Sequence, residues 1–86
     1  MRTIETASGA VHEVEMCGAA DGYLHIILTE STFAGAVEEF SKPENTRTIT
    51  DHIQEEITVV HAGYTRLVSV AWIEGKKHRV ILKKTE

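Results

Sequence analysis

The stretch VVHAGYTRLVSV, residues Val59 to Val70, is the most clearly patterned part of the 86-residue chain. Two runs rich in β-branched residues flank the triplet Gly63-Tyr64-Thr65. Because β-branched side chains suit strands and glycine tolerates a positive φ, we predict two strands joined at a corner. Two roles for Tyr64 stay open. We favour packing at the corner, and the alternative is an anchor in a protein interface.

Strand-like patterns continue on both sides of this corner. Seven segments are expected to be extended: 2–6, 11–16, 23–29, 46–50, 56–62, 66–73 and 78–84. We expect a five-residue loop at 18–22 and a hairpin turn at 74–77. Alternation predicts that Val14 and Met16 share one face, as do Val68, Val70 and Trp72. Consecutive strands with short turns indicate antiparallel pairing.

A helix interrupts the strands. Phe33, Val37 and Phe40 recur at i, i+4 and i+7, the spacing of an amphipathic helix of about nine residues. We expect Ser31 to cap its start and Pro43 to end it, with a turn at 43–45. Both phenylalanines should dock on the sheet, whereas Glu38 and Glu39 should face water.

These elements predict an α+β fold, with residues 1–86 as a single domain. The expected sheet is antiparallel, has six to seven strands, and is either open or curled into a partial barrel. One helix is inserted after the third strand. So small a core supplies little net stability, which makes oligomerisation a natural supplement.

Charge is unevenly distributed along the chain. Residues 1–60 hold eleven acidic and three basic residues, whereas residues 61–86 hold six basic and two acidic ones. This is either an ordinary solvated surface or a bipolar subunit that pairs its basic edge with a neighbour's acidic face. Nucleic-acid binding is disfavoured because the basic residues are few and the whole chain is net acidic. The candidate interface residues are Tyr64, Trp72, Lys76, Lys77 and Arg79.

The sequence predicts no catalytic, cofactor or metal site. Its five histidines lack the spacing of known metal motifs, and Cys17 with His12 has no signature of an activated thiol. The glutamate pairs 13/15 and 38/39 lie on expected polar faces, and no phosphate-binding loop is present. A single cysteine excludes an internal disulfide and fits a reducing compartment. Neither a signal-peptide pattern nor an apolar run of roughly 18–20 residues occurs, so we expect no membrane partner.

Three segments carry a family resemblance: FSKPENTRTI (Phe40–Ile49), GYTRLVSV (Gly63–Val70) and VILKK (Val80–Lys84). Together with the strand-turn-strand start, they resemble small uncharacterised proteins encoded in phages and prophages of gut Firmicutes. The resemblance implies a structural-module protein associated with the tail or with head joining. It implies no residue role, because the shared motifs are structural.

We therefore expect a phage-type structural or assembly protein that acts by protein–protein contact, with itself or with phage structural proteins, and without catalysis. The expected location is the host cytoplasm or the virion. One alternative is a small accessory or regulatory binding protein. The other, which the residues disfavour, is a small metal-dependent or hydrolytic enzyme.

Overall fold

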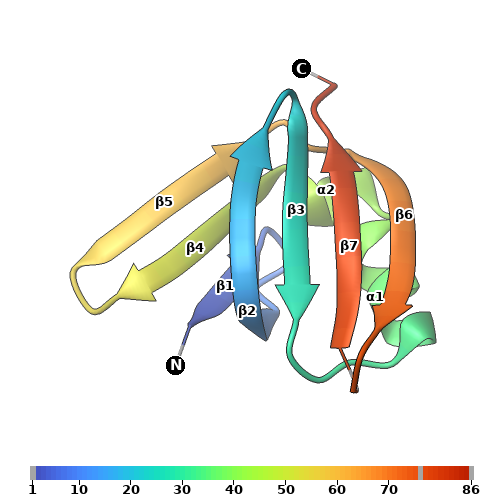
Figure 1. Ribbon diagram of the computed structural model, residues 1–86. Helices are drawn as coiled ribbons and strands as arrows, with labels where there is room; N and C mark the ends of the chain where they lie inside the picture. The colour runs from blue at the N-terminus through green and yellow to red at the C-terminus, as the bar shows by residue number, and fades with distance from the viewer. Residues whose placement is uncertain (1, 76, 86) are drawn as a thin grey trace.

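A computed structural model describes residues 2–75 and 77–85 (Figure 1). Seven antiparallel strands form one sheet in the order β5-β4-β1-β2-β3-β7-β6, and two helices lie between β3 and β4 in the chain. The elements are β1 (Thr3–Thr6), β2 (Val11–Ala20), β3 (Tyr23–Leu28), α1 (Phe33–Phe40), α2 (Pro43–Thr46), β4 (Thr48–Gln54), β5 (Ile57–Ala62), β6 (Arg66–Ile73) and β7 (Lys77–Lys83). The α+β class with an antiparallel sheet is therefore confirmed.

The sheet bends about its longest strand, β2. The first half of β2 pairs with β1, and the second half pairs with β3. This divides the sheet into one wing of β1, β4 and β5 and another of β3, β7 and β6, and the β4–β5 hairpin projects to one side (Figure 1). The sheet stays open, with β5 and β6 as its two edges, so it does not close into a barrel.

The helical region differs in detail from the expectation. Thr32, rather than Ser31, caps α1, because its Oγ1 accepts a hydrogen bond from the Gly35 N–H at 3.1 Å. Pro43 then begins a second short helix, α2, where the sequence predicted a turn. Proline suits this position because the first helical residue needs no N–H donor.

The β2–β3 connection is also shorter than expected. Asp21 and Gly22 have φ values of 53° and 82°, so they form the two-residue turn that matches the twist of an antiparallel hairpin. Residues 18–20, which the sequence placed in a loop, instead extend β2 and pair with β3.

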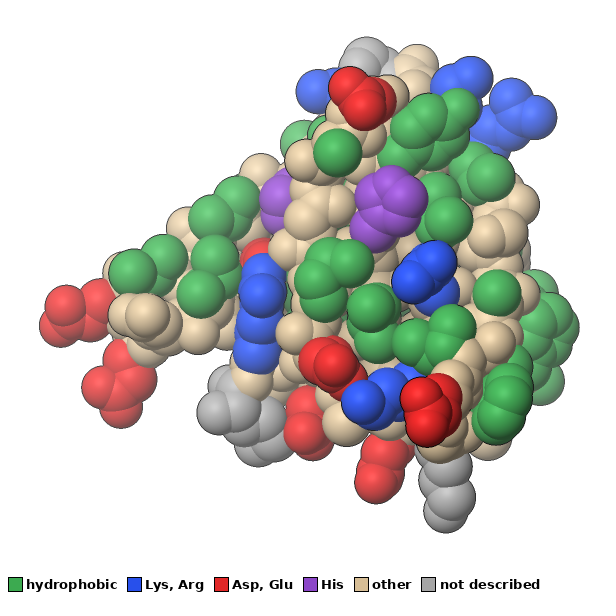
Figure 2. Space-filling view, viewed as in Figure 1, with side chains coloured by type: hydrophobic (Ala, Val, Ile, Leu, Met, Phe, Trp, Pro, Cys, Tyr) green, Lys and Arg blue, Asp and Glu red, His purple; other side chains and the backbone are tan. Residues whose placement is uncertain are grey.

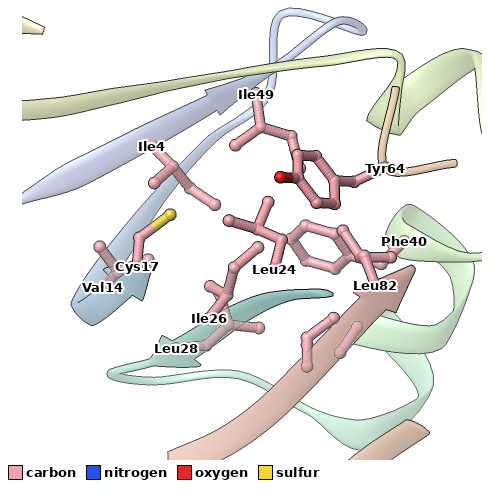
Figure 3. Close-up of a cluster of buried hydrophobic side chains, with 12 residues drawn as sticks. Ile4, Val14, Cys17, Leu24, Ile26, Leu28, Phe40, Ile49, Tyr64 and Leu82 are labelled. Atoms are coloured by element: carbon pink, nitrogen blue, oxygen red, sulfur yellow. The ribbon is translucent and has the colours of Figure 1, made fainter. Parts of the chain in front are cut away.

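The core lies between the two wings and is closed by α1 (Figure 3). Ile4 and Ile49 come from one wing, and Leu24 and Leu82 come from the other. Phe40 of α1 is fully buried among them, as expected. The prediction for Phe33 is wrong, because this side chain at the start of α1 is 54% exposed.

Two β-bulges change the predicted faces of β2 and, in part, of β6. Each inserts one extra residue, Glu15 in β2 and Val68 in β6, and the side-chain alternation changes phase beyond it. Cys17 rather than Met16 therefore joins Val14 in the core. In β6 the bulge separates Val68 from Val70, and Leu67 and Val70 pack against the core. Val70 and Trp72 share a face as predicted, although Trp72 is exposed.

The Gly63 corner is confirmed. Gly63 has φ = 86°; its N–H donates to the Arg47 carbonyl at 3.0 Å, and its own carbonyl accepts from the Thr85 N–H at 2.9 Å. The ring of Tyr64 is buried between the wings beside Ile49 (Figure 3). The corner before β6 is therefore hydrogen-bonded both to the residue that precedes β4 and to Thr85, which follows β7.

Candidate functional site

The structure does not gather the residues that the sequence singled out as an interface. Tyr64 belongs to the core, with Lys84 Nζ lying 5.6 Å from its ring centroid. Lys77 and Arg79 flank the buried His78 in β7 and therefore lie on the outer face of the sheet. Trp72 pairs in register with His78, so it lies on the same face as His78 and on the other face from Lys77 and Arg79. Lys76 is outside the described residues.

Trp72 forms part of an exposed aromatic surface at the β6 edge. Its side chain is 66% exposed. Phe33 lies close by, with its ring 6.2 Å from that of His78, which is the register partner of Trp72. Lys77 instead pairs with Glu15 at 2.5 Å on the outer face. Exposed ion pairs of this kind contribute little to stability.

The β4–β5 hairpin carries the other exposed apolar surface. Figure 2 shows hydrophobic side chains along the projecting hairpin and acidic side chains at its tip. Ile57, Val59 and Val60 of β5 are all exposed, and Val60 is 58% exposed. The tip residues Glu55 and Glu56 are exposed as well. The sequence identified 56–62 as a strand, but it carried no signal that this strand is an edge.

A buried polar cluster lies where the hairpin meets β2. Asp51 of β4 is only 1% exposed and accepts two hydrogen bonds from the Arg2 guanidinium. Arg2 Nη2 also donates to the Cys17 carbonyl at 2.8 Å. The side chains of Cys17, Asp51 and His61 bring one sulfur, one oxygen and one nitrogen within 4.8 Å of one another. We call Arg2, Cys17, Asp51 and His61 the Asp51 cluster.

The Asp51 cluster contains ligand types that zinc accepts, thiolate, carboxylate and imidazole. The Arg2 guanidinium, however, already contacts both carboxylate oxygens and places a positive charge where a cation would bind. Burial, with a further contribution from Asp51, raises the pKa of Cys17 to about 12. The sulfur is therefore a protonated thiol at neutral pH, which is unsuited to nucleophilic attack. In this arrangement Arg2 neutralises the buried carboxylate of Asp51.

Sequence reasoning missed this cluster because its members lie on three different strands and at the chain's start. Cys17 comes from β2, Asp51 from β4 and His61 from β5, with separations that match no metal or catalytic motif. The available signal was the register of β4 and β5. Ile49, opposite His61, and Asp51, two residues on, share a face of β4, so His61 faces the same way as both.

A second polar cluster joins α1 to the β1–β2 hairpin through Glu39. Glu39 Oε1 accepts from Thr6 Oγ1 at 2.5 Å and from Ser8 Oγ at 3.0 Å, and His12 Nε2 lies 3.5 Å away. Asn45 donates to the Glu39 carbonyl at 3.0 Å. Burial raises the pKa of Glu39, but the hydrogen bonds and His12 outweigh it, so the pKa is lowered from its ordinary value. Glu39 therefore does not simply face water, as the sequence suggested.

The hollow at the tip of the hairpin is not an enclosed pocket for chemistry. It is lined by four consecutive residues, 52–55, and is open to solvent. Within the described ranges, no helix has the length and apolar character needed to cross a bilayer.

No family model, curated protein or solved structure matches this chain. Among the described surfaces, the edge strand β5 combines exposed apolar side chains with a side that no other described strand pairs.

Proposed function

We propose that this chain is a small assembly protein that acts by protein–protein contact, of the kind encoded in phage structural modules. The observation that carries the proposal is the edge strand β5. Its six residues include no charged residue, no proline and no bulge, and its valines and isoleucine are exposed. Natural sheets usually protect an edge with these devices, so an unprotected edge favours pairing with another chain.

The projecting hairpin favours binding at the β5 edge, and the Arg2–Asp51 pair disfavours a reaction at the Asp51 cluster. The hairpin projects away from the core, so an incoming strand reaches β5 without displacing any described element (Figure 1). The Asp51 cluster, the strongest alternative as a chemical centre, is saturated by Arg2 and holds a protonated thiol. An accessory binding protein would use the same edge, and it differs from an assembly protein only in the partner.

Site-specific photo-crosslinking in cells tests the proposal. A benzoylphenylalanine at position 60 replaces an exposed side chain on the open edge. The matched control places it at position 11, where Val11 is similarly exposed but belongs to β2, which is separated from β5 in the sheet by β4 and β1. We expect covalent protein adducts at position 60 and far fewer at position 11. Absence of protein adducts at position 60, or equal yields at both positions, would contradict binding through β5.

Mass spectrometry of the adducts then separates the two kinds of partner. Adducts with another copy of the chain, or with a protein found in purified phage particles, support an assembly role. Adducts with a single protein that is absent from such particles favour the accessory alternative.

A further inference from the structure

The edge of β5 differs from the other open edge of the sheet in how it is protected. β6 carries the bulge at Val68 and begins with Arg66, and α1 packs beside it. The only register shift in the β4–β5 hairpin places its extra residue, Ile53, in β4, so β5 itself is regular. Among residues 2–75 and 77–85, no strand pairs with the outer side of β5. Its outward N–H and C=O groups therefore form a regular ladder open to a partner.

Charges of opposite sign lie at the two ends of β5. The strand begins directly after the exposed Glu55 and Glu56 at the hairpin tip. It ends at Ala62, directly before Gly63, whose N–H donates to the carbonyl of the exposed Arg47. The exposed Arg66 follows Gly63 closely in the chain. The exposed Lys84 also lies near, because the N–H of its neighbour Thr85 donates to the Gly63 carbonyl. The strand is thus acidic at its start and basic at its end, with only uncharged residues between.

A strand with this polarity is complementary to itself when it is reversed. If two copies of β5 lie antiparallel, the acidic tip of each copy reaches the basic end of the other. A parallel arrangement would instead place like charges together at both ends. An isologous two-fold contact of this kind closes on itself and yields a dimer.

We propose that the occupant of the β5 edge is a second copy of this chain, paired antiparallel through β5 about a two-fold axis at Val59 or Val60. The two sheets then continue into one another, and the exposed side chains of Ile57, Val59 and Val60 pack against their counterparts. The inference rests on the proposed function, because it names the partner of the same edge. A single six-residue ladder is a small interface, so we expect a dissociation constant on the order of micromolar.

Light scattering of the purified full chain over a concentration series tests the dimer. We expect a monomer–dimer equilibrium that weakens between about 0.01 M and 1 M salt, because the Debye length falls from about 30 to 3 Å. Val60→Lys places like charges close together at the axis and should weaken the dimer about tenfold or more. Val11→Lys, at a similarly exposed position on β2, which β4 and β1 separate from β5, is the control and should leave the dimer unchanged.

A mixing experiment tests the antiparallel arrangement. Glu56→Lys and Arg47→Glu should each weaken self-association, because each places like charges at both ends of the pair. Mixed in equal amounts, the two variants should form a heterodimer of wild-type strength. At one end the lysine introduced at position 56 then meets the glutamate introduced at position 47, and at the other end the native Glu56–Arg47 contact remains. Recovery on mixing cannot come from misfolding of either variant.

Three outcomes would overturn the inference: a monomer at every concentration and salt, a dimer that Val60→Lys leaves intact, or variants that do not recover on mixing. A purified monomer whose position 60 still crosslinks to a different protein in cells would reject self-pairing alone. Binding through the edge would then stand with another partner. Failure of both experiments would reject the proposed function as well.

Discussion

The guanidinium of Arg2 donates two hydrogen bonds to the carboxylate of Asp51, from Nε to Oδ1 at 3.1 Å and from Nη2 to Oδ2 at 2.7 Å. Arg2 immediately precedes β1, and Asp51 lies in the middle of β4, so the pair joins segments 49 residues apart in the chain. The same guanidinium reaches the Cys17 carbonyl in β2. One side chain near the N-terminus therefore neutralises the buried charge at the root of the projecting hairpin.

Arg2→Ala should destabilise the protein by about 3 kcal/mol, because it leaves the buried Asp51 carboxylate without its counter-charge. Chemical denaturation at neutral pH measures the loss. Lys77→Ala is the matched control, since it removes an exposed ion pair with Glu15 and should cost about 1 kcal/mol or less. Equal losses for the two variants would show that the Arg2–Asp51 pair contributes no more than a surface contact.

Removing Arg2 should also change how the Asp51 cluster responds to zinc. In Arg2→Ala the carboxylate no longer contacts a cationic group, so Cys17, Asp51 and His61 become free to act as ligands, with the thiol losing its proton on binding. We expect added Zn²⁺ to raise the melting temperature of Arg2→Ala and to leave the wild-type value unchanged. Equal stabilisation of both proteins would contradict the argument that Arg2 blocks a cation.

The two phenylalanines of α1 should differ sharply in their contribution to stability. Phe40→Ala removes a fully buried ring from between the wings and should cost about 3–5 kcal/mol. Phe33→Ala removes a half-exposed ring from the same helix and should cost about 1 kcal/mol or less. Thermal melts of the two variants provide the comparison. A Phe40→Ala protein that melts near the wild-type temperature would refute the docking of α1 on the core.

Much of the fold could be predicted because local pattern and tertiary structure agree along most of the chain. Residues 66–73 are strand β6 with the predicted bounds, and the glycine corner before it has the expected positive φ. Two of the failures lie where one inserted residue decides the outcome. The bulge at Glu15 puts Cys17 in place of Met16 in the core, and the bulge at Val68 separates Val68 from Val70; periodicity cannot locate an extra residue in advance.

The candidate site was less predictable than the fold, because it depends on strand order. The sequence of β5 looks like that of any buried strand, and only its place at the end of the sheet makes its valines exposed. The Asp51 cluster likewise exists only because β2, β4 and β5 meet. The excess of basic residues near the C-terminus predicts one interface on the last hairpin, but the structure places Trp72 on one face of the sheet and Lys77 and Arg79 on the other.

Cys17 should make stability fall at alkaline pH. Burial raises its pKa from 9.0 to about 12 in the folded protein, so folding favours the neutral thiol. The resulting stability is fully present below pH 9 and is lost as the pH rises from about 9 to about 12. The quantity to compare is the pH slope of the stability of wild type against that of Cys17→Ala, because the difference isolates the contribution of the thiol. Identical slopes would show that Cys17 is not protected by burial.

Glu39 should have the opposite effect, at acidic pH. Its folded pKa is lowered from 4.5, so its contribution is present above that value and is lost as the pH falls through the folded pKa. Glu39→Gln replaces charge-assisted hydrogen bonds from Thr6 and Ser8 by neutral ones and should cost about 1 kcal/mol at neutral pH. Denaturation of wild type and variant at a series of pH values should show this difference shrinking below pH 4.5. Glu38→Gln, its exposed neighbour on α1, is the control and should show no such dependence. A constant difference for Glu39→Gln across the series would mean that the charge on Glu39 does not fasten α1 to the β1–β2 hairpin.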